Sequence, residues 1–420
     1  MNTPLRALAL VSFLLSLAGS GRGATPDWPQ WRGPARDGHA APGVAIPTRL
    51  PATPKIVWRV NVGGGFSSPV VVEDSLVYLD ENGQQEVAHR LDPKTGREFW
   101  QVPFAARTED EWGAGPRSTP ILDGARAYVQ SCNGEFRCLN LADGHVRWGV
   151  SFEKDFGVKF LGSKSNEGVA SRRGNNGSGL VDGPDVIVPV GSTNSACLVC
   201  FNKKTGAVRW KSQSDEMAYS SLMVAPLAGV PQVVAFSADA LLGVDRADGR
   251  LLWRVPLRTN AKRHAASPVI WGDVVAVNSH TIGLVALRIA RAGDGFTATE
   301  LWANRDLKIN LATPVLVGEH LFSHGPAKNF VCVDAATGKQ LWAQDGFGKD
   351  YSSTLALGKN LLVLTDLGEL VLVAADAGKY QELGRQQVCG KNWSFPAYAD
   401  GKLFVRDARE LQCLDLLNAN

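Results

Sequence analysis

The sequence predicts an all-β fold, an eight-bladed β-propeller of four-stranded antiparallel blades. Three observations lead to this prediction: a turn-and-tryptophan unit recurs along the chain, its spacing is that of a propeller blade, and each end of the chain holds the part of a blade that the other end lacks. A period of roughly 40–50 residues, with about four short strands in each repeat, is typical of propellers.

The recurring unit is a strand, a tight turn and a second strand that ends in tryptophan. It is clearest at residues 91–100, Leu-Asp-Pro-Lys-Thr-Gly-Arg-Glu-Phe-Trp. The Asp side chain can accept hydrogen bonds from backbone N–H groups two residues on, and Gly96 suits a turn position with positive φ. Further well-formed copies occupy residues 140–148, 202–210, 245–253 and 334–342. Two degenerate copies end at Trp302 and at Leu383.

The ends of these units, together with Trp58, recur at the spacing of blades. They lie at residues 58, 100, 148, 210, 253, 302, 342 and 383, in steps of 42, 48, 62, 43, 49, 40 and 41 residues. The chain starts with an outermost strand at Trp58 that has no blade of its own. It ends with three strands, between residues 395 and 415, that lack an outermost one. Pairing the two ends closes one composite blade and leaves no free edge, which gives eight blades.

Four segments are expected, namely a signal peptide over residues 1–24, a Pro-rich arm over 25–55, the propeller over 56–416 and a tail over 417–420. Arg6 precedes an apolar run that has the pattern of a secretory signal peptide and is too short to span a membrane. Cleavage after Ala18 and after Ala24 are both open. Because no cysteine precedes Cys132, we expect an exported protein without a lipid anchor, either periplasmic or extracellular.

Composition and charge restrict the kind of partner. The hydrophobic content of 45% is ample for a core, and the formal net charge is only +3. It falls to +1 once a segment containing Arg6 and Arg22 is removed. A chain so close to neutral is not expected to bind nucleic acid, and we expect a monomer without a transmembrane segment.

Three features lie outside the strand pattern. In the arm, Trp28 and Trp31 either pack onto the side or base of the propeller, which we favour, or form a partner-binding motif. The insertion at residues 155–176 is read as a surface loop, functional or merely solvated. The cysteines are expected to be structural thiols, because Cys138, Cys200, Cys332 and Cys413 occupy one equivalent position in four blades, beyond disulfide reach.

One ring of side chains is expected at a mouth of the central channel. Each blade opens with a strand preceded by small residues, and three residues before the Pro of that strand, or one earlier where the side chain is aliphatic, lies a larger side chain. The ring is Phe66, Arg117, Asn176, Tyr219, His264, Asn310, Tyr351 and Trp393. Such a set suits a flat or anionic ligand, or a peptide. The alternative is that the aromatic rings plug the funnel against solvent.

No catalytic or metal site is predicted. No pair of histidines has the spacing of metal ligands, and Cys197-Leu-Val-Cys200 stands alone as a Cys-x-x-Cys sequence. Asp350 is the only carboxylate level with the ring, and nothing orders a Ser-His-Asp set.

The repeat Asp-x-x-Thr-Gly-x-x-x-Trp, with strands that begin Ser-Ser/Thr-Pro, resembles the pyrroloquinoline-quinone-like (PQQ-like) repeat family. The resemblance spans Ile56 to Leu416 and implies an eight-bladed propeller. The segment Trp-Pro-Gln-Trp-Arg-Gly-Pro, residues 28–34, is similar to the leader of secreted bacterial members. The family has two relevant branches, quinoprotein dehydrogenases that hold the quinone with Ca²⁺ and use an acidic base, and a non-catalytic branch that includes the scaffold lipoprotein BamB of outer-membrane protein assembly.

The residues depart from both branches. No two cysteines are adjacent, as expected beneath a quinone, the ring offers at most one carboxylate, and an N-terminal lipidated cysteine is absent. We therefore expect a non-catalytic propeller without a cofactor, which binds or scaffolds a protein partner or small ligand through its channel mouth and rim loops. The alternative is a PQQ-dependent dehydrogenase oxidising an alcohol or sugar, with PQQ near Trp393 or Tyr351, Arg117 pairing a quinone carboxylate, and Asp350 as base.

Overall fold

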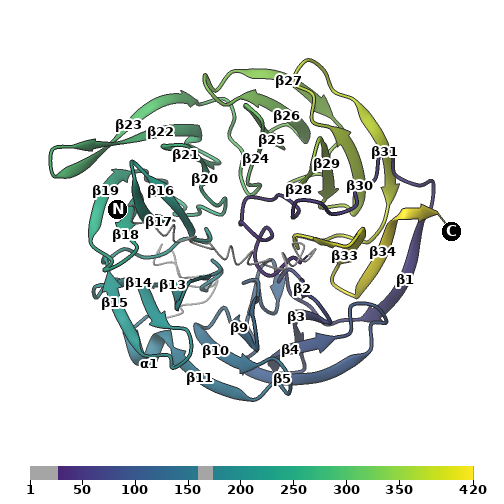
Figure 1. The fold of residues 1–420 in the computed structure, drawn as a ribbon, viewed down its shortest axis with the longest axis horizontal. Coiled ribbons are helices and arrows are strands. Elements are labelled where there is room, and N and C mark those ends of the chain that lie inside the picture. The colour runs from purple at the N-terminus through teal and green to yellow at the C-terminus, as the bar shows by residue number, and fades with distance from the viewer. Residues whose placement is uncertain (1–26, 159–173, 420) are drawn as a thin grey trace, which may run out of the picture.

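The computed structural model describes residues 27–158 and 174–419. The expected signal peptide and most of the insertion at 155–176 lie outside the described residues. Within the described part of the chain, the strands form eight four-stranded antiparallel sheets arranged in a ring, and two short strands form a ninth sheet (Figure 1). The predicted all-β, eight-bladed propeller is confirmed. No helix among these residues is long and apolar enough to cross a membrane.

Each blade runs from an inner strand near the axis to an outer strand at the circumference. The first four blades contain β2 (Val70–Val72), β3 (Ser75–Asn82), β4 (Gln85–Leu91) and β5 (Glu98–Ala106); β8 (Ile121–Asp123), β9 (Arg126–Gln130), β10 (Glu135–Asn140) and β11 (Val146–Ser151); β12 (Leu180–Asp182), β13 (Asp185–Ser192), β14 (Ala196–Asn202) and β15 (Val208–Ser212); β16 (Met223–Leu227), β17 (Val230–Phe236), β18 (Ala240–Asp245) and β19 (Leu251–Pro256). The next three contain β20 (Val269–Trp271), β21 (Val274–Ser279), β22 (Gly283–Ala292) and β23 (Gly295–Asn304); β24 (Val315–Val317), β25 (His320–His324), β26 (Asn329–Asp334) and β27 (Gln340–Asp345); β28 (Ser352–Leu357), β29 (Asn360–Thr365), β30 (Glu369–Ala374) and β31 (Glu382–Gln387).

The eighth blade joins the two ends of the chain. It contains β32 (Ala397–Ala399), β33 (Lys402–Arg406), β34 (Glu410–Ala419) and, as its outer strand, β1 (Pro54–Asn61). β1 pairs antiparallel with β34, with Trp58 opposite Cys413. The closure predicted from the chain ends is thus confirmed, and β34 runs on to Ala419. The remaining elements are β6 (Glu109–Asp110), β7 (Gly113–Ala114) and the helix α1 (Phe152–Phe156).

Tryptophans on the outer strands join neighbouring blades. Six of them donate the indole N–H to a backbone carbonyl in the next blade's turn at 2.8–3.3 Å: Trp58 to Pro93, Trp100 to Leu141, Trp148 to Lys203, Trp210 to Arg246, Trp302 to Ala335 and Trp342 to Asp376. The indole ring also packs over the turn of the next blade. At Gly338, where φ is 71°, an added Cβ would lie 2.3 Å from the ring of Trp302. Both the backbone and the close ring therefore require glycine.

The cysteines are free thiols, all seven of them. Four fill one buried position of the third strand, each opposite a tryptophan of the outer strand: Cys138 opposite Trp148, Cys200 opposite Trp210, Cys332 opposite Trp342 and Cys413 opposite Trp58. This agrees with the structural role expected from the repeat register.

The arm runs into the ring instead of lying on its side or base, and Figure 1 shows its purple trace near the axis. The backbone N–H and C=O of Trp28 pair with those of Val71 at 2.7 and 2.9 Å. Leu122 donates its backbone N–H to Pro29, and Ala356 donates to Gly38. Trp28 is only 1% exposed. The expectation that Trp28 pins the arm holds, but the contact lies inside the channel.

Two buried arginines of the arm reach the inner strands that converge there. Arg32 donates to the carbonyl of Pro314 at 2.7 Å. Arg36 donates to three carbonyls, those of Leu222, Gly179 and Ser178, at 2.9–3.2 Å. Burial lowers the pKa of Arg32 to about 10 and that of Arg36 to about 9, so both stay charged at neutral pH. With Trp31 hydrogen-bonded to Ser267 and packed against Phe395, the arm contacts all eight blades.

Candidate functional site

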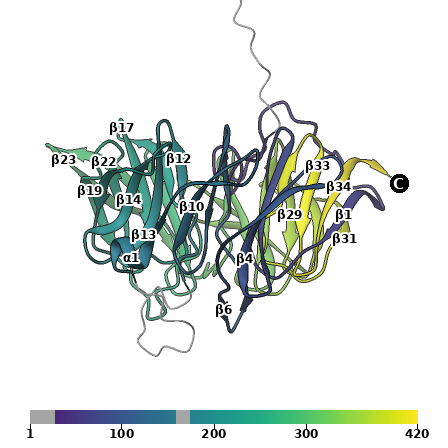
Figure 2. The same ribbon diagram turned by 90° about the horizontal axis from the view of Figure 1, so that it is seen from below.

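The channel holds a cavity of about 320 Å³. Its lining includes Trp112, which lies between β6 and β7. Figure 2 shows β6 at the lower side of the ring, the side on which α1 also lies. The structure brings seven of the eight predicted ring residues to its wall: Phe66, Arg117, Asn176, Tyr219, Asn310, Tyr351 and Trp393. The other residues of the wall are Trp31, Trp112, Ser178, Ser221, Arg263, Ala265, Leu311, Thr313, Asp350, Ser352 and Phe395.

The eighth residue, His264, lies elsewhere. Its ring stacks on Phe236 in the blade core, with centroids 4.0 Å apart, and it is fully buried. Burial lowers its pKa to about 4, so the imidazole is neutral. The predicted position of His264 at the channel mouth is wrong because neighbouring side chains of an extended segment point to opposite sides. Arg263 and Ala265 therefore face the cavity where His264 was expected.

Three aromatic rings form one continuous wall. The ring centroids of Phe66 and Trp393 are 5.3 Å apart, and so are those of Trp112 and Trp393. The guanidinium of Arg117 lies 5.4 Å from the ring of Phe66. Trp112 remains 46% exposed. These rings line the cavity and do not fill it.

The arm provides the floor of the cavity. Trp31 packs on Phe395 with centroids 5.4 Å apart, and its indole N–H donates to Ser267 at 3.0 Å. Beneath Trp31 the carbonyl of Ser178, a cavity residue, accepts from Arg36. The repeat alignment could not identify this floor, because the arm lies outside the repeat. The cavity is consequently closed at one end by the arm and open at the other.

Trp112 was also missed by the sequence alignment. It belongs to a short hairpin of β6 and β7, inserted between β5 and β8. The 48-residue step between Trp100 and Trp148, longer than most, was the available signal. Asp110 of this hairpin forms an ion pair with Arg117 at 2.5 Å. The anchoring of Arg117 limits what this side chain can offer a ligand.

The remaining wall is polar and well ordered. Arg263 donates to Asn310 at 3.3 Å, and the hydroxyl groups of Tyr351 and Ser353 share a hydrogen bond of 2.9 Å. Burial raises the pKa of Tyr351 to about 12, so its hydroxyl stays protonated. Asn176 accepts from the thiol of Cys132 at 3.1 Å.

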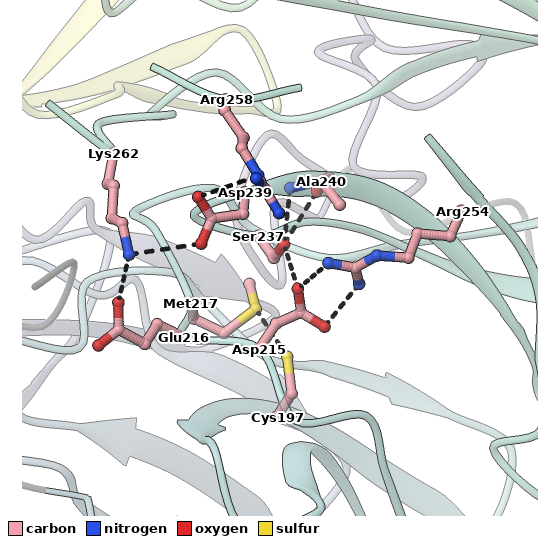
Figure 3. A network of polar contacts seen from close by, with 10 residues as sticks. All are labelled: Cys197, Asp215, Glu216, Met217, Ser237, Asp239, Ala240, Arg254, Arg258 and Lys262. Atoms are coloured by element: carbon pink, nitrogen blue, oxygen red, sulfur yellow. Dashed lines mark hydrogen bonds and ion pairs between the residues drawn. The ribbon is translucent and has the colours of Figure 1, made fainter. Parts of the chain in front are cut away.

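Ion pairs on the fourth blade hold the loops that carry Tyr219 and Arg263 (Figure 3). Asp215 accepts from both terminal nitrogens of Arg254, at 2.6 and 2.7 Å. Lys262 bridges Glu216 at 3.1 Å and Asp239 at 3.4 Å, and Arg258 lies 3.9 Å from Asp239. Because Glu216 precedes Tyr219 and Lys262 adjoins Arg263, this network positions one side of the cavity wall.

The cavity wall carries little negative charge. Of its described residues, only Asp350 is acidic. Backbone N–H groups of Lys349 and Asp350 donate to Asp366 at 2.7 and 3.0 Å, which fixes this loop. Within residues 27–158 and 174–419, no group of three or more His, Cys, Asp or Glu side chains is placed to hold a metal ion.

Comparisons with known proteins agree on the architecture. A family model described as "Outer membrane protein assembly factor BamB" matches residues 50–158 and 83–344, more than half of the chain. A protein named outer membrane protein assembly factor BamB, from Burkholderia pseudomallei (strain K96243), is 25% identical over 233 residues. That match covers 55% of this chain and 52% of the relative, so it spans about half of the relative's length.

Solved structures with the same fold include members of both branches. BamB from Moraxella catarrhalis superposes with a TM-score of 0.58 at 14% identity, over 86% of this chain and 99% of that one. A quinohemoprotein alcohol dehydrogenase from Comamonas testosteroni superposes with a TM-score of 0.50 at 13% identity, over 94% and 81%. At such identities these likenesses show the fold alone.

Proposed function

Since the chain belongs to the family described as outer membrane protein assembly factor BamB, we propose that it is an exported, non-catalytic propeller that binds a protein partner or a small ligand through its channel mouth and rim loops. The observation that carries this proposal is the cavity of about 320 Å³ with an aromatic wall of Phe66, Trp112 and Trp393. Aromatic side chains at a partly exposed pocket are the usual anchors of binding sites.

The form of the mouth favours an apolar group of the partner as the inserted part. Trp112 presents much of its ring to solvent, while Tyr351 and Phe395 are buried deeper in the same cavity. Burying such surface on binding provides a favourable free energy of roughly 25 cal/mol per Å². The polar side chains of the opposite wall, Asn310 and Arg263, would then set the orientation of what is bound.

The alternative, a PQQ-dependent dehydrogenase, has less support from the same residues. Ca²⁺ takes six to eight oxygen ligands, commonly with several carboxylates. The described wall offers only Asp350, and Asp110 is already paired with Arg117. Arg117 is thus not free to pair a quinone carboxylate as that alternative requires. These residues do not fit a Ca²⁺-bound quinone, and we expect no cofactor.

A quantitative capture experiment tests the proposal. The purified protein is immobilised and exposed to an extract of the exported proteins of its source cells, beside two variants. Trp112→Ala with Trp393→Leu alters the mouth, and Phe99→Ala removes an exposed apolar side chain from the outer strand β5. We expect the amount of captured partner to be at least tenfold lower with the mouth variant and unchanged with Phe99→Ala. Equal capture by all three proteins contradicts the proposal.

A calorimetric titration with PQQ, with and without Ca²⁺, tests the alternative. We expect no heat of binding under either condition. Micromolar binding that needs Ca²⁺ and weakens in Arg117→Ala would favour the dehydrogenase, and oxidation of alcohols and sugars would then be assayed.

A further inference from the structure

The hairpin that carries Trp112, which we call the finger, comprises residues 108–116. Its tip meets the rest of the mouth through Trp112, whose ring centroid lies 5.3 Å from that of Trp393. Its base is held by the ion pair of Asp110 with Arg117 and by a backbone hydrogen bond of 2.9 Å from Gly115 to Thr108. Glu109 of the finger also pairs with Arg107 at 3.1 Å, and the carbonyl of Pro116 accepts from the backbone of Phe66 at 2.8 Å. The ion pair of Asp110 is the contact that joins the finger to Arg117, a residue of the cavity wall.

A buried carboxyl group lies beneath the base of the finger. Glu86, on β4, has no exposed surface, and its Oε1 accepts a hydrogen bond from the hydroxyl of Thr108. Its Oε2 is buried and has no hydrogen-bond partner in the described part of the chain. Burial raises the pKa of Glu86 to about 7, against the opposing effects of hydrogen bonds from the side chain and backbone of Thr108, the charge of Arg117 and a hydrogen bond from the backbone of Cys132. Its charge therefore changes across the neutral pH range.

Most groups around Glu86 cannot balance its charge. Glu81, opposite Glu86 on β3, is an acid and is itself paired with Arg107 at 2.7 Å. Cys132, which follows β9, has its thiol pKa raised to about 12 by burial, so it stays neutral. Arg107 is further shared with Glu109 at 3.1 Å.

Arg117 is the cation that acts on both acids. It is bonded to Asp110, and its charge also lowers the pKa of Glu86. The Nε of Arg117 is buried without a partner among the described residues, as is Oε2 of Glu86. A donor and an acceptor are thus both left unsatisfied, and a buried carboxylate without a partner is costly. Ionisation of Glu86 therefore favours an ion pair between Glu86 and Arg117.

We propose that Glu86 regulates the mouth: when Glu86 gives its proton to solvent, Arg117 exchanges Asp110 for Glu86, and the released finger carries Asp110 into solvent and moves Trp112 away from Trp393. The mouth is narrow at acidic pH and wide at alkaline pH. This inference rests on the proposed function only in treating the mouth as a binding site, because the movement itself needs no ligand.

The test uses the ligand-free protein with 5-fluorotryptophan in place of tryptophan, followed by ¹⁹F NMR between pH 5.5 and 8.5. Trp112→Phe and Trp393→Phe assign the two resonances. We expect both to shift with a common midpoint near pH 7. In Glu86→Gln the shift is lost and the resonances keep their acidic positions. In Asp110→Asn they keep their alkaline positions at every pH.

Glu81→Gln is the matched control, since it removes a neighbouring acid that already has its own arginine, and it should retain the shift. A shift that persists unchanged in Glu86→Gln overturns the proposal, and so does the absence of any shift in the unaltered protein. If Glu86→Gln fails to fold, as judged by circular dichroism, Asp110→Asn decides alone. The proposal is supported if the two resonances shift with pH in the unaltered protein but not in Asp110→Asn. It is overturned if they shift with pH in Asp110→Asn as they do in the unaltered protein.

The two proposals fail separately. If the ¹⁹F resonances titrate but partner capture is unchanged by the mouth variants, the proton-dependent movement is supported and the proposed function is wrong. If the resonances do not titrate but capture depends on Trp112 and Trp393, the proposed function is supported and the movement is wrong.

Discussion

The circumference and the axis of this propeller follow opposite rules. At the circumference, one contact is repeated, a tryptophan that donates to the next blade's turn and covers its glycine, as Trp302 does at Gly338. At the axis, equivalent positions of the eight blades carry seven kinds of side chain: Phe66, Arg117, Asn176, Tyr219, Ala265, Leu311, Tyr351 and Trp393. A ring of equal blades needs one recurring interface, whereas recognition needs differences. The departures from the repeat at the axis are therefore the positions at which we propose recognition.

The exceptions at the circumference follow the same logic. Trp253 donates to Gln232 within its own blade at 2.6 Å. In the next blade β22 and β23 are ten residues long each and are joined by a short turn at Gly293 and Asp294, which lies at the end of this longer hairpin. Leu383 occupies the last tryptophan position, and there the arm comes close, with Leu50 donating its N–H to Leu383 at 3.3 Å. Where the repeated contact is missing, other local contacts are present.

The largest expected effect on stability is at the axis. Trp28→Ala removes a side chain that is 1% exposed and stacks on Phe395, with ring centroids 6.3 Å apart. Truncation of a buried aromatic residue typically costs about 3–5 kcal/mol. We expect a loss of that size in urea denaturation, and a loss below about 1 kcal/mol would contradict the view that the arm is part of the core.

The second effect depends on pH. The pKa of Glu86 in the folded protein, about 7, lies above the ordinary 4.5. The folded state thus binds more protons than the unfolded state between these values, and the stability present below pH 4.5 is lost as pH rises through 7. Glu86→Gln has no such loss, so relative to the unaltered protein it should gain up to about 3 kcal/mol between pH 4.5 and 8. Parallel stability curves in urea denaturation would contradict this expectation.

A third prediction probes the repeated contact with a matched pair of glycines. Gly338→Ala forces a positive φ on alanine and places its Cβ against Trp302, which should cost about 1–3 kcal/mol. Gly378→Ala, in a degenerate turn, meets only a carboxylate oxygen of Asp376 at 3.3 Å and needs no positive φ. We expect its melting temperature to be nearly unchanged. Similar losses at both positions would show that the tryptophan contact is not the cause.

The smallest effect on stability is predicted for Trp112→Ala. The side chain is 46% exposed and belongs to the finger, outside all eight blades. Surface substitutions of this kind usually change stability by no more than about 0.5 kcal/mol. Thermal unfolding should therefore be unchanged while partner capture falls. A large loss of stability would show that Trp112 is needed for folding, and the fall in partner capture could then not be assigned to lost recognition.

The sequence was sufficient for the circumference and for most of the mouth. The period of the turn units, with the complementary chain ends, identified eight blades, and seven of the eight residues predicted from the register before each inner strand lie in the cavity wall. His264 was wrong because a shift of one residue in an extended segment reverses the direction of the side chain. Trp31 and Trp112 could not be placed by alignment, because a repeat says nothing about segments without counterparts in other blades.

Photo-cross-linking in the producing cells tests directly whether a partner binds at the mouth or on the circumference. A photoreactive phenylalanine analogue is placed either at position 112, in the mouth, or at position 146, where Val146 is 52% exposed on the outer strand β11. We expect a discrete cross-linked partner from position 112 that is absent from position 146. Cross-links from position 146 with none from position 112 would contradict this expectation, since recognition would then lie on the repeated circumference and not at the mouth.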